Sequence, residues 1–544
     1  MTYANTTRPA DPVQDLPKTL REAAVAHREG RVDDAWPRYR RFLARNPEHP
    51  VALELCGLLF SRFDGAESAF RRQVESGRNP ATGWFSLGNV HQRSGEHDVA
   101  ISCYQRALTV RPRLARARHR LGQCLRMRRR PQAALREYRR ASSRGVDHAQ
   151  LHHDVGLALV DVREIDAAIA AFRAALRRDA RHVPSHRALN SLLWQQDRVD
   201  EYLASYGRAL RRHPREQGLR CAYATGLLHA GRGVCAEGIL RDGLAGAPDS
   251  AALNNALAAA LEAQGRWREA LEYHARAVAA GAAGPAHHVD YARALLARGR
   301  PREALGHARL GAERMPFDQR ALAYLGLCWR LLGDDRDARL NDYDNLVVTR
   351  DLPLPPGYAD IASFNAPLTD ALDRLHTGKR HPAEQSPRVG IQTTGDLLGC
   401  REPEIEALLP SLRRCVADYV AELPDDPEHP LFARRSAAFE FSASWSVKLE
   451  PRGYHEMHVH PRGWLSAVYY VQVPDAVARR DDVGGALQFG VPDIDVGEQG
   501  EARRSIRPAA GRLVVFPSYL WHGTVPYEAE GHRTTIAFDV VPHA

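Results

Sequence analysis

Signals for secretion and for membrane insertion are missing from this chain of 544 residues. The first residues have no basic start followed by an apolar core, and the most apolar stretches, such as LNNALAAALEA at 253–263, are short and interrupted by polar residues. A signal peptide or a spanning helix needs a longer uninterrupted apolar segment. We therefore expect a protein of the cytoplasm that has no membrane partner.

Cysteine is scarce as well. The eight cysteines lie far apart and none forms a CxxC pair. A disulfide framework or a cysteine-rich zinc site needs clustered cysteines, so both are excluded. We predict reduced cysteines that pack as small apolar side chains.

The chain also lacks long blocks of like charge. Its formal net charge of +9 comes mostly from arginine, and no pattern of aromatic residues accompanies the basic segments. Nucleic-acid sites usually combine the two, so we expect no nucleic-acid partner. With 44% hydrophobic and 26% charged residues, the chain should fold almost throughout, and its length requires more than one structural unit.

A period of 34 residues runs through the first three fifths of the chain. The segment at 81–112 carries tryptophan, glycine, alanine and aromatic residues in the order Trp84, Leu87, Gly88, Gly95, Ala100, Tyr104, Ala107 and Pro112. Steps of 34 from Ala100 reach Ala134, Ala168, Tyr202, Ala236, Ala270, Ala304 and Ala338. This spacing resembles the tetratricopeptide repeat. The resemblance implies an all-α solenoid of about ten helix pairs over residues 15–340, with a concave groove that holds a peptide or protein.

After Ala338 the period stops and the composition changes. A proline-rich segment at 341–360 is typical of a linker. Residues 361–544 have two helical patterns, at 366–378 and 402–423, and then short apolar or alternating runs at 439–450, 465–473, 485–490, 512–523 and 534–541. We predict a multidomain fold in which the solenoid precedes a mainly-β jelly roll, or double-stranded β-helix, with flanking helices.

Three histidines and an arginine occur at informative positions in this second part. His458 and His460 are two residues apart, so on a strand they project to one face and can share a metal. His522 ends the run at 512–523, and Arg533 opens the last strand, with Thr535 on the same face. Three ligands on one face of a metal leave positions open for other groups. Arginine suits a carboxylate because its planar fork binds two oxygens.

Two neighbouring residues leave alternatives open. Glu456 would lie on the face of His458 by strand alternation, so it is a rival ligand to His460. His455 would point away from that face. Three imidazoles are also the ligand set of a catalytic zinc site, so the ligands alone do not choose between iron and zinc.

Four motifs extend the pattern over the whole second part: HPAEQSPRVGIQTTG at 381–395, HVHPRGWLSAVYY at 458–470, GALQFGVP at 485–492 and GRLVVFPSYLWHGTVP at 511–526. Together they resemble the 2-oxoglutarate/Fe(II) oxygenases that proteobacteria fuse to tetratricopeptide repeats. The resemblance implies Fe(II), the co-substrate 2-oxoglutarate and O2. It implies a catalytic metal held by His458, His460 and His522, and 2-oxoglutarate bound by Arg533. Thr535 shares the face of Arg533, and strand alternation turns either Tyr469 or Tyr470 toward the pocket, so we expect Thr535 and Tyr470 to assist in binding 2-oxoglutarate, with Tyr469 and a purely packing role as the alternatives. In the usual triad of these enzymes a carboxylate stands where this chain has His460.

The resemblance implies a dioxygenase that hydroxylates a peptide or protein recruited by the repeats. Two other functions stay open on the sequence. The repeats could form an interaction scaffold whose barrel senses the metal or 2-oxoglutarate. The barrel could also be a cupin-like metalloenzyme that uses no 2-oxoglutarate, although Arg533 would then have no evident role.

Overall fold

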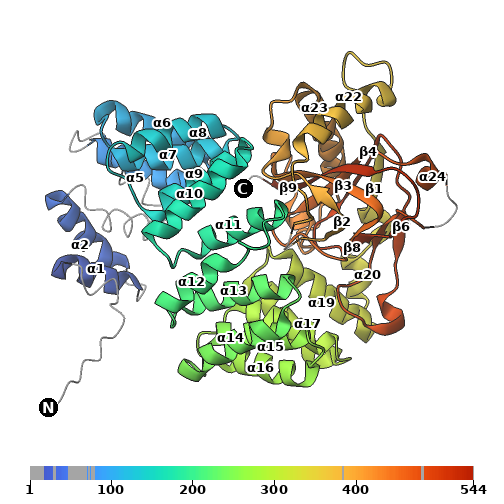
Figure 1. The fold of residues 1–544 in the computed structure, drawn as a ribbon, viewed down its shortest axis with the longest axis horizontal. Helices are drawn as coiled ribbons and strands as arrows, with labels where there is room; N and C mark the ends of the chain where they lie inside the picture. Colours follow the sequence, from blue (N-terminus) through green and yellow to red (C-terminus); the bar gives the residue numbers. More distant parts are fainter. Residues whose placement is uncertain are drawn as a thin grey trace. The chain divides into compact units, whose positions relative to one another are not determined.

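The structure is a computed structural model that describes residues 17–28, 32–46, 70, 74, 80–382, 385–479 and 483–542. By its contacts the chain divides into two compact units, 1–162 and 163–544. Helices fill the first unit and continue into the second (Figure 1). They are α1 (Lys18–Arg28), α2 (Val32–Arg45), α5 (Pro80–Arg93), α6 (His97–Val110), α7 (Ala115–Met127), α8 (Pro131–Ser142), α9 (Ala149–Asp161), α10 (Ile165–Arg178), α11 (Val183–Gln195), α12 (Ala204–Arg212), α13 (Gln217–His229), α14 (Gly233–Gly246), α15 (Ala251–Glu262), α16 (Trp267–Ala279), α17 (Pro285–Leu296), α18 (Pro301–Arg314), α19 (Gln319–Leu332), α20 (Arg336–Leu340) and α21 (Tyr343–Leu346).

Small residues of the 34-residue period lie where paired helices approach closely. A side chain at Gly88 on α5 would come within 2.5 Å of the Tyr104 ring on α6, and one at Gly122 would come within 2.4 Å of Tyr138 in the next pair. The periodic alanines from Ala100 to Ala304 that fall in helices are fully buried. The predicted solenoid is therefore confirmed. Ala338 is exposed on the short helix α20, so the period has lost its packing role there.

The period is interrupted at Tyr202, where alanine is replaced. Helix α12 begins two residues later, at Ala204, and its N-cap Leu203 has a left-handed φ of 63°. The side chain of Asn190 on α11 accepts a hydrogen bond from the Leu203 backbone N–H at 2.5 Å. Gly226 on α13 leaves room for Leu203, because a β-carbon there would lie 2.4 Å from its side chain.

Two antiparallel sheets follow the helices (Figure 1). The six-stranded sheet has the order β1-β7-β4-β9-β3-β2, and the three-stranded sheet has the order β6-β5-β8. The strands are β1 (Val348–Asp351), β2 (Pro387–Gln392), β3 (Phe439–His455), β4 (Leu465–Gln472), β5 (Leu487–Phe489), β6 (Arg504–Ile506), β7 (Arg512–Pro517), β8 (His522–Thr524) and β9 (Arg533–Pro542). This arrangement confirms the predicted jelly roll.

Helices flank the barrel as predicted. Helices α22 (Ile361–Leu375) and α23 (Pro403–Glu422) bury apolar faces that belong to the barrel's core, and a short helix α24 (Asp475–Ala478) follows β4. Residues 341–360, the expected linker, contain α21 and β1, and β1 pairs with β7 along its whole length.

One predicted strand is two strands. The run at 512–523 breaks after Pro517, so that β7 lies in the large sheet and β8 in the small one. The break turns the chain at 518–521 and delivers His522 to the second sheet. The sequence did not show this because both halves are apolar.

The last repeats and the barrel share one hydrophobic core. It runs from Val289 on α17 through Tyr324 on α19 to Phe538 and Val540 on β9. A division by contacts therefore does not fall at the end of the repeat register near 340.

None of the seven cysteines among the described residues forms a disulfide, and Cys56 lies outside them. No helix in the described ranges is both long and apolar enough to cross a membrane.

Candidate metal and co-substrate site

A cavity of about 760 Å³ opens between the two sheets of the barrel. Its wall includes alternate residues of β9, which are Arg533, Thr535, Ala537 and Asp539. Further lining comes from β4, β5, β8 and the segment that follows β3. The three histidines singled out by the sequence all lie on this wall.

The nitrogen atoms of His458, His460 and His522 lie within 4.8 Å of one another. The ring centroids are 4.2 Å apart for His458 and His522 and 5.0 Å apart for His460 and His522. Strand β3 ends at His455, so the premise that His458 and His460 alternate on a strand is wrong. They converge because His458 forms an isolated bridge with His522, and the backbone N–H of His460 donates to the Ser518 carbonyl.

Each of these three imidazoles donates through Nδ1. The acceptors are the Glu456 carbonyl for His458 at 2.7 Å, the Leu520 carbonyl for His522 at 2.9 Å, and the Asp539 carboxylate for His460. An Nδ1–H tautomer leaves a lone pair on Nε2, and such contacts to carbonyls and carboxylates are the usual support of metal-bound histidine.

The Nε2 atoms of His458 and His460 are 3.1 Å apart. Two lone pairs at that distance repel each other unless a cation lies between them. Two nitrogens bound to one metal at ~2.1 Å and at a right angle would be about 3 Å apart. The donor set thus fits a single metal ion.

Burial keeps the imidazoles of His458 and His522 neutral. It lowers the pKa of His458 to about 3, and the adjacent imidazole of His460 contributes to the lowering. The pKa of His522 is also well below its usual value, again chiefly because of burial. A neutral imidazole can bind a metal at neutral pH without first losing a proton.

Arg533 occupies another part of the same wall. Its side chain is among the most buried in the described chain, at 2% exposure, and donates to the Gly485 carbonyl at 2.6 Å. Burial lowers its pKa, yet a guanidinium stays charged in proteins. Among the described residues no carboxylate pairs with it, and its Nε has no hydrogen-bond partner. A buried, uncompensated cation is costly, so it marks a place where an anion would be stabilised.

Tyr470 and Thr535 lie beside this arginine. The Arg533 guanidinium is 5.9 Å from the centroid of the Tyr470 ring, and the Tyr470 hydroxyl is buried without a partner in the described residues. Tyr469 points the other way, where its hydroxyl donates to Asn365 at 2.7 Å. Thr535 pairs with Tyr470 across β4 and β9 and lines the cavity.

Glu456 and His455 differ from their sequence-based interpretations. The Glu456 carboxylate forms an ion pair with Arg388 at 2.6 Å and is not among the clustered metal-ligating groups. His455 was expected to point away, but it lines the cavity, with its ring centroid 6.1 Å from that of His458. Strand alternation could not place either residue, because the strand ends at His455.

Comparison with protein families finds a match for the segment that contains most of this cavity's lining. Residues 443–539, which include the three histidines and Arg533, match the family described as "Putative 2OG-Fe(II) oxygenase". Residues 79–145, 154–216 and 252–286 match tetratricopeptide repeat families. The chain thus combines segments that match tetratricopeptide repeats with a segment that matches this oxygenase family.

Two of the solved structures that match the chain are tetratricopeptide repeat proteins. A crystal structure of YrrB, a TPR protein with an unusual peptide-binding site, is 15% identical and covers 40% of this chain and 93% of its own, with a TM-score of 0.25. A thermophilic TPR protein of Thermus thermophilus is 23% identical and covers 34% of this chain and 99% of its own, with a TM-score of 0.26. A comparison with curated proteins finds no match.

The barrel contains supporting residues whose roles sequence reasoning missed. Ser466 on β4 donates to Asp539 at 2.8 Å and lies 2.8 Å from the Ser518 hydroxyl. The Ser386 hydroxyl is 3.0 Å from Nδ1 of His455 and 3.3 Å from Nε2 of His458. Asp539 had a signal in the sequence, since it is three alternations beyond Arg533 on one strand. Ser386 lies in the motif at 381–395, but its contact with His458 was not predictable because the two residues are 72 positions apart.

Proposed function

We propose that the protein is an Fe(II)- and 2-oxoglutarate-dependent dioxygenase that hydroxylates a peptide or protein segment recruited by its repeats. One observation carries the proposal. The same cavity is lined by three clustered imidazoles that can bind a metal and by a buried cation, Arg533, that has no carboxylate partner in the described residues. The family match of residues 443–539 supports the same class of chemistry.

Each residue of the site would have one role in binding the metal or the co-substrate. His458, His460 and His522 would hold the metal through Nε2, and Asp539 would keep His460 in the right tautomer. Arg533 would bind the distal carboxylate of 2-oxoglutarate with its two-pronged fork, assisted by the hydroxyls of Tyr470 and Thr535. Bound iron supplies the activation of O2, one atom of which ends in succinate and the other in the hydroxylated product, with release of CO2.

Three neutral imidazoles leave the full charge of the divalent metal uncompensated. That charge favours the anionic 2-oxo acid as a further ligand and is compatible with zinc as well as iron. Arg533 distinguishes the two functions, because a cupin-like site without 2-oxoglutarate has no use for a buried cation at that place.

The deciding experiment is an anaerobic titration of 2-oxoglutarate into the Fe(II) protein. Binding of a 2-oxo acid to such a site should produce a visible metal-to-ligand absorption band. Addition of O2 should then convert 2-oxoglutarate to succinate. A protein that binds iron but gives neither the band nor succinate would favour the scaffold or cupin-like alternatives.

A further inference from the structure

Within residues 163–544 the repeat helices contact the barrel at two separate places. At the first, the end of α11 holds the segment that follows α22. The indole Nε1 of Trp194 donates to the His381 carbonyl at 3.0 Å, and the Lys379 backbone N–H donates to the Gln195 carbonyl at 2.8 Å. Arg380 adds an ion pair with Asp197 at 2.6 Å.

The second contact is made by α17 and α19, further along the chain. Tyr324 donates to Asp493 at 2.9 Å, Arg330 donates to the Gly490 carbonyl at 2.6 Å, and the Gln319 backbone N–H donates to the Pro461 carbonyl at 3.1 Å. These helices also share the barrel's hydrophobic core. The second contact is therefore part of the folded core, whereas the first consists of hydrogen bonds and an ion pair.

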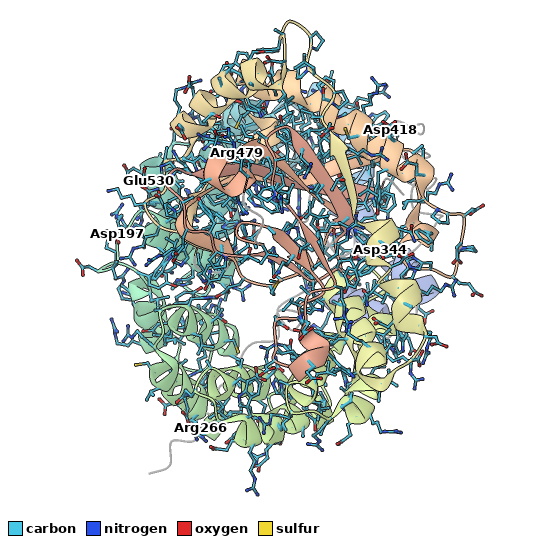
Figure 2. All side chains as sticks on the ribbon, turned by 90° about the vertical axis from the view of Figure 1, so that its right-hand side faces the viewer. Asp197, Arg266, Asp344, Asp418, Arg479 and Glu530 are labelled. Atoms are coloured by element: carbon cyan, nitrogen blue, oxygen red, sulfur yellow. The ribbon has the colours of Figure 1, made fainter. Side chains whose placement is uncertain are left out.

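Helices α12 to α16 connect the two contacts. In Figure 2 the helices coloured green to yellow and the barrel, all within residues 163–544, form a closed ring of ribbon. The metal cavity faces this ring, because its lining includes His229 at the end of α13 together with Trp445, His460 and Arg462 of the barrel. A substrate that approaches the metal from this side must fit between α13 and the rim of the barrel.

The charges of the cavity select among such substrates. Arg388 is neutralised by Glu456, and the Asp539 carboxylate is engaged by His460. Arg533 lies at the buried end that the co-substrate would use. Arg462 is exposed at the rim, and in the described ranges it forms no ion pair with a carboxylate. Among the charged residues described on the cavity wall, Arg462 is therefore the one at the rim whose charge no ion pair offsets.

We propose that the ring restricts the substrate to an extended peptide segment with acidic side chains, which enters between α13 and the rim at Arg462. This inference rests on the proposed function and names the substrate class of the same site. A cavity of about 760 Å³ can hold the co-substrate and a short stretch of chain, whereas a folded domain would be stopped at the ring. Arg462 would pair with an acidic side chain of the segment.

The test uses the full-length protein loaded with Mn(II) and 2-oxoglutarate, so that no turnover occurs. Three fluorescent octapeptides, of glutamate, of lysine and of alternating serine and glycine, are titrated by fluorescence anisotropy. Octaglutamate should bind at least about tenfold more tightly than the other two. Arg462→Glu should weaken octaglutamate binding by about tenfold or more.

The matched control is Arg479→Glu, the same charge change at an 81% exposed side chain beside α24 that does not line the cavity (Figure 2). It should leave the affinity for octaglutamate unchanged. The inference is overturned if octaglutamate fails to bind, if the neutral peptide binds equally well, or if both arginine variants weaken binding alike. If the wild type binds neither Mn(II) nor 2-oxoglutarate, the proposed function itself is refuted. Failure of the inference and failure of the proposed function are thus distinguishable.

Discussion

The carboxylate of Asp539 accepts a hydrogen bond from Nδ1 of His460, and Ser466 donates to the same carboxylate at 2.8 Å. In the proposed site Asp539 would thus support a bound metal through His460. The usual triad that the sequence resembles has a carboxylate directly on the metal. In the proposed site the negative charge would lie one position outward, behind His460.

Asp539→Asn should weaken metal binding by about 10- to 100-fold while the fold is retained, because an amide no longer enforces the Nδ1–H tautomer of His460. Titration with Fe(II) or Mn(II) under anaerobic conditions measures the effect. Asp475→Asn, at an 85% exposed carboxylate, is the control and should bind metal as the wild type does. Equal affinities of the two variants would show that Asp539 has no influence on the metal.

The histidines themselves give a second prediction. His458→Ala or His522→Ala should abolish stoichiometric Fe(II), because each removes one of three ligands. Glu456→Gln should keep the metal, since its carboxylate pairs with Arg388 instead of facing the cluster. Metal analysis of the purified variants decides between them. Retention of iron in both histidine variants, or its loss only in Glu456→Gln, would contradict the ligand set.

Much of this site could be predicted from the sequence. The parts that could not be predicted share one cause. The triad and Arg533 were predicted because their motifs and spacing resemble one family, and strand alternation left Tyr469 and Tyr470 as candidates for one pocket position. Alternation did not apply to Glu456, His458 and His460, because β3 ends at His455. His455 was expected to point away, yet as the last residue of β3 it lines the cavity. Where a strand ends is decided by tertiary packing, such as the bridge between His458 and His522.

The repeats show a similar limit. Their period predicted the helices and the buried alanines from Ala100 to Ala304. It did not predict that α17 and α19 would bury apolar faces against the barrel, because an apolar helix face looks the same in sequence whatever covers it. The proposed boundary near 340 marks the end of the period, whereas the core continues across it.

This shared core predicts how fragments behave. Residues 80–544 begin with a complete repeat and should fold and bind metal as the full chain does. Residues 341–544 lack α17 and α19, which cover Trp521 through Tyr324 at a ring distance of 5.3 Å. That fragment should aggregate or bind metal at least about tenfold more weakly, because exposed apolar surface is costly and Trp521 adjoins His522. A soluble fragment with wild-type metal affinity would contradict the shared core.

Arg533 leads to the sharpest prediction for the co-substrate. Arg533→Ala should keep Fe(II) but weaken 2-oxoglutarate binding by roughly 30- to several-thousand-fold, which corresponds to about 2–5 kcal/mol for a buried charged pair. Arg533→Lys should recover only part of the affinity, because an ammonium cannot form the two-pronged contact. The visible absorption band in the anaerobic titration reports both. Unchanged affinity in the alanine variant would remove 2-oxoglutarate from the site.

The same side chain should reverse its effect on stability when the co-substrate is added. Without the co-substrate, Arg533 is a buried cation with no carboxylate partner in the described residues. Arg533→Met should therefore raise the free energy of unfolding by on the order of 1 kcal/mol, although the hydrogen bond to the Gly485 carbonyl is lost. With 2-oxoglutarate at 100 times its dissociation constant, the wild type should gain about 2.7 kcal/mol and the variant almost nothing. Thermal unfolding of the metal-loaded proteins measures both effects. Without 2-oxoglutarate Arg533→Met should unfold at a higher temperature than the wild type, and with 2-oxoglutarate the wild type should unfold at the higher temperature. Arg479→Met is the control and should follow the wild type. If Arg533→Met is less stable than the wild type in both conditions, the arginine serves the fold. If it gains as much from 2-oxoglutarate as the wild type does, the co-substrate binds elsewhere.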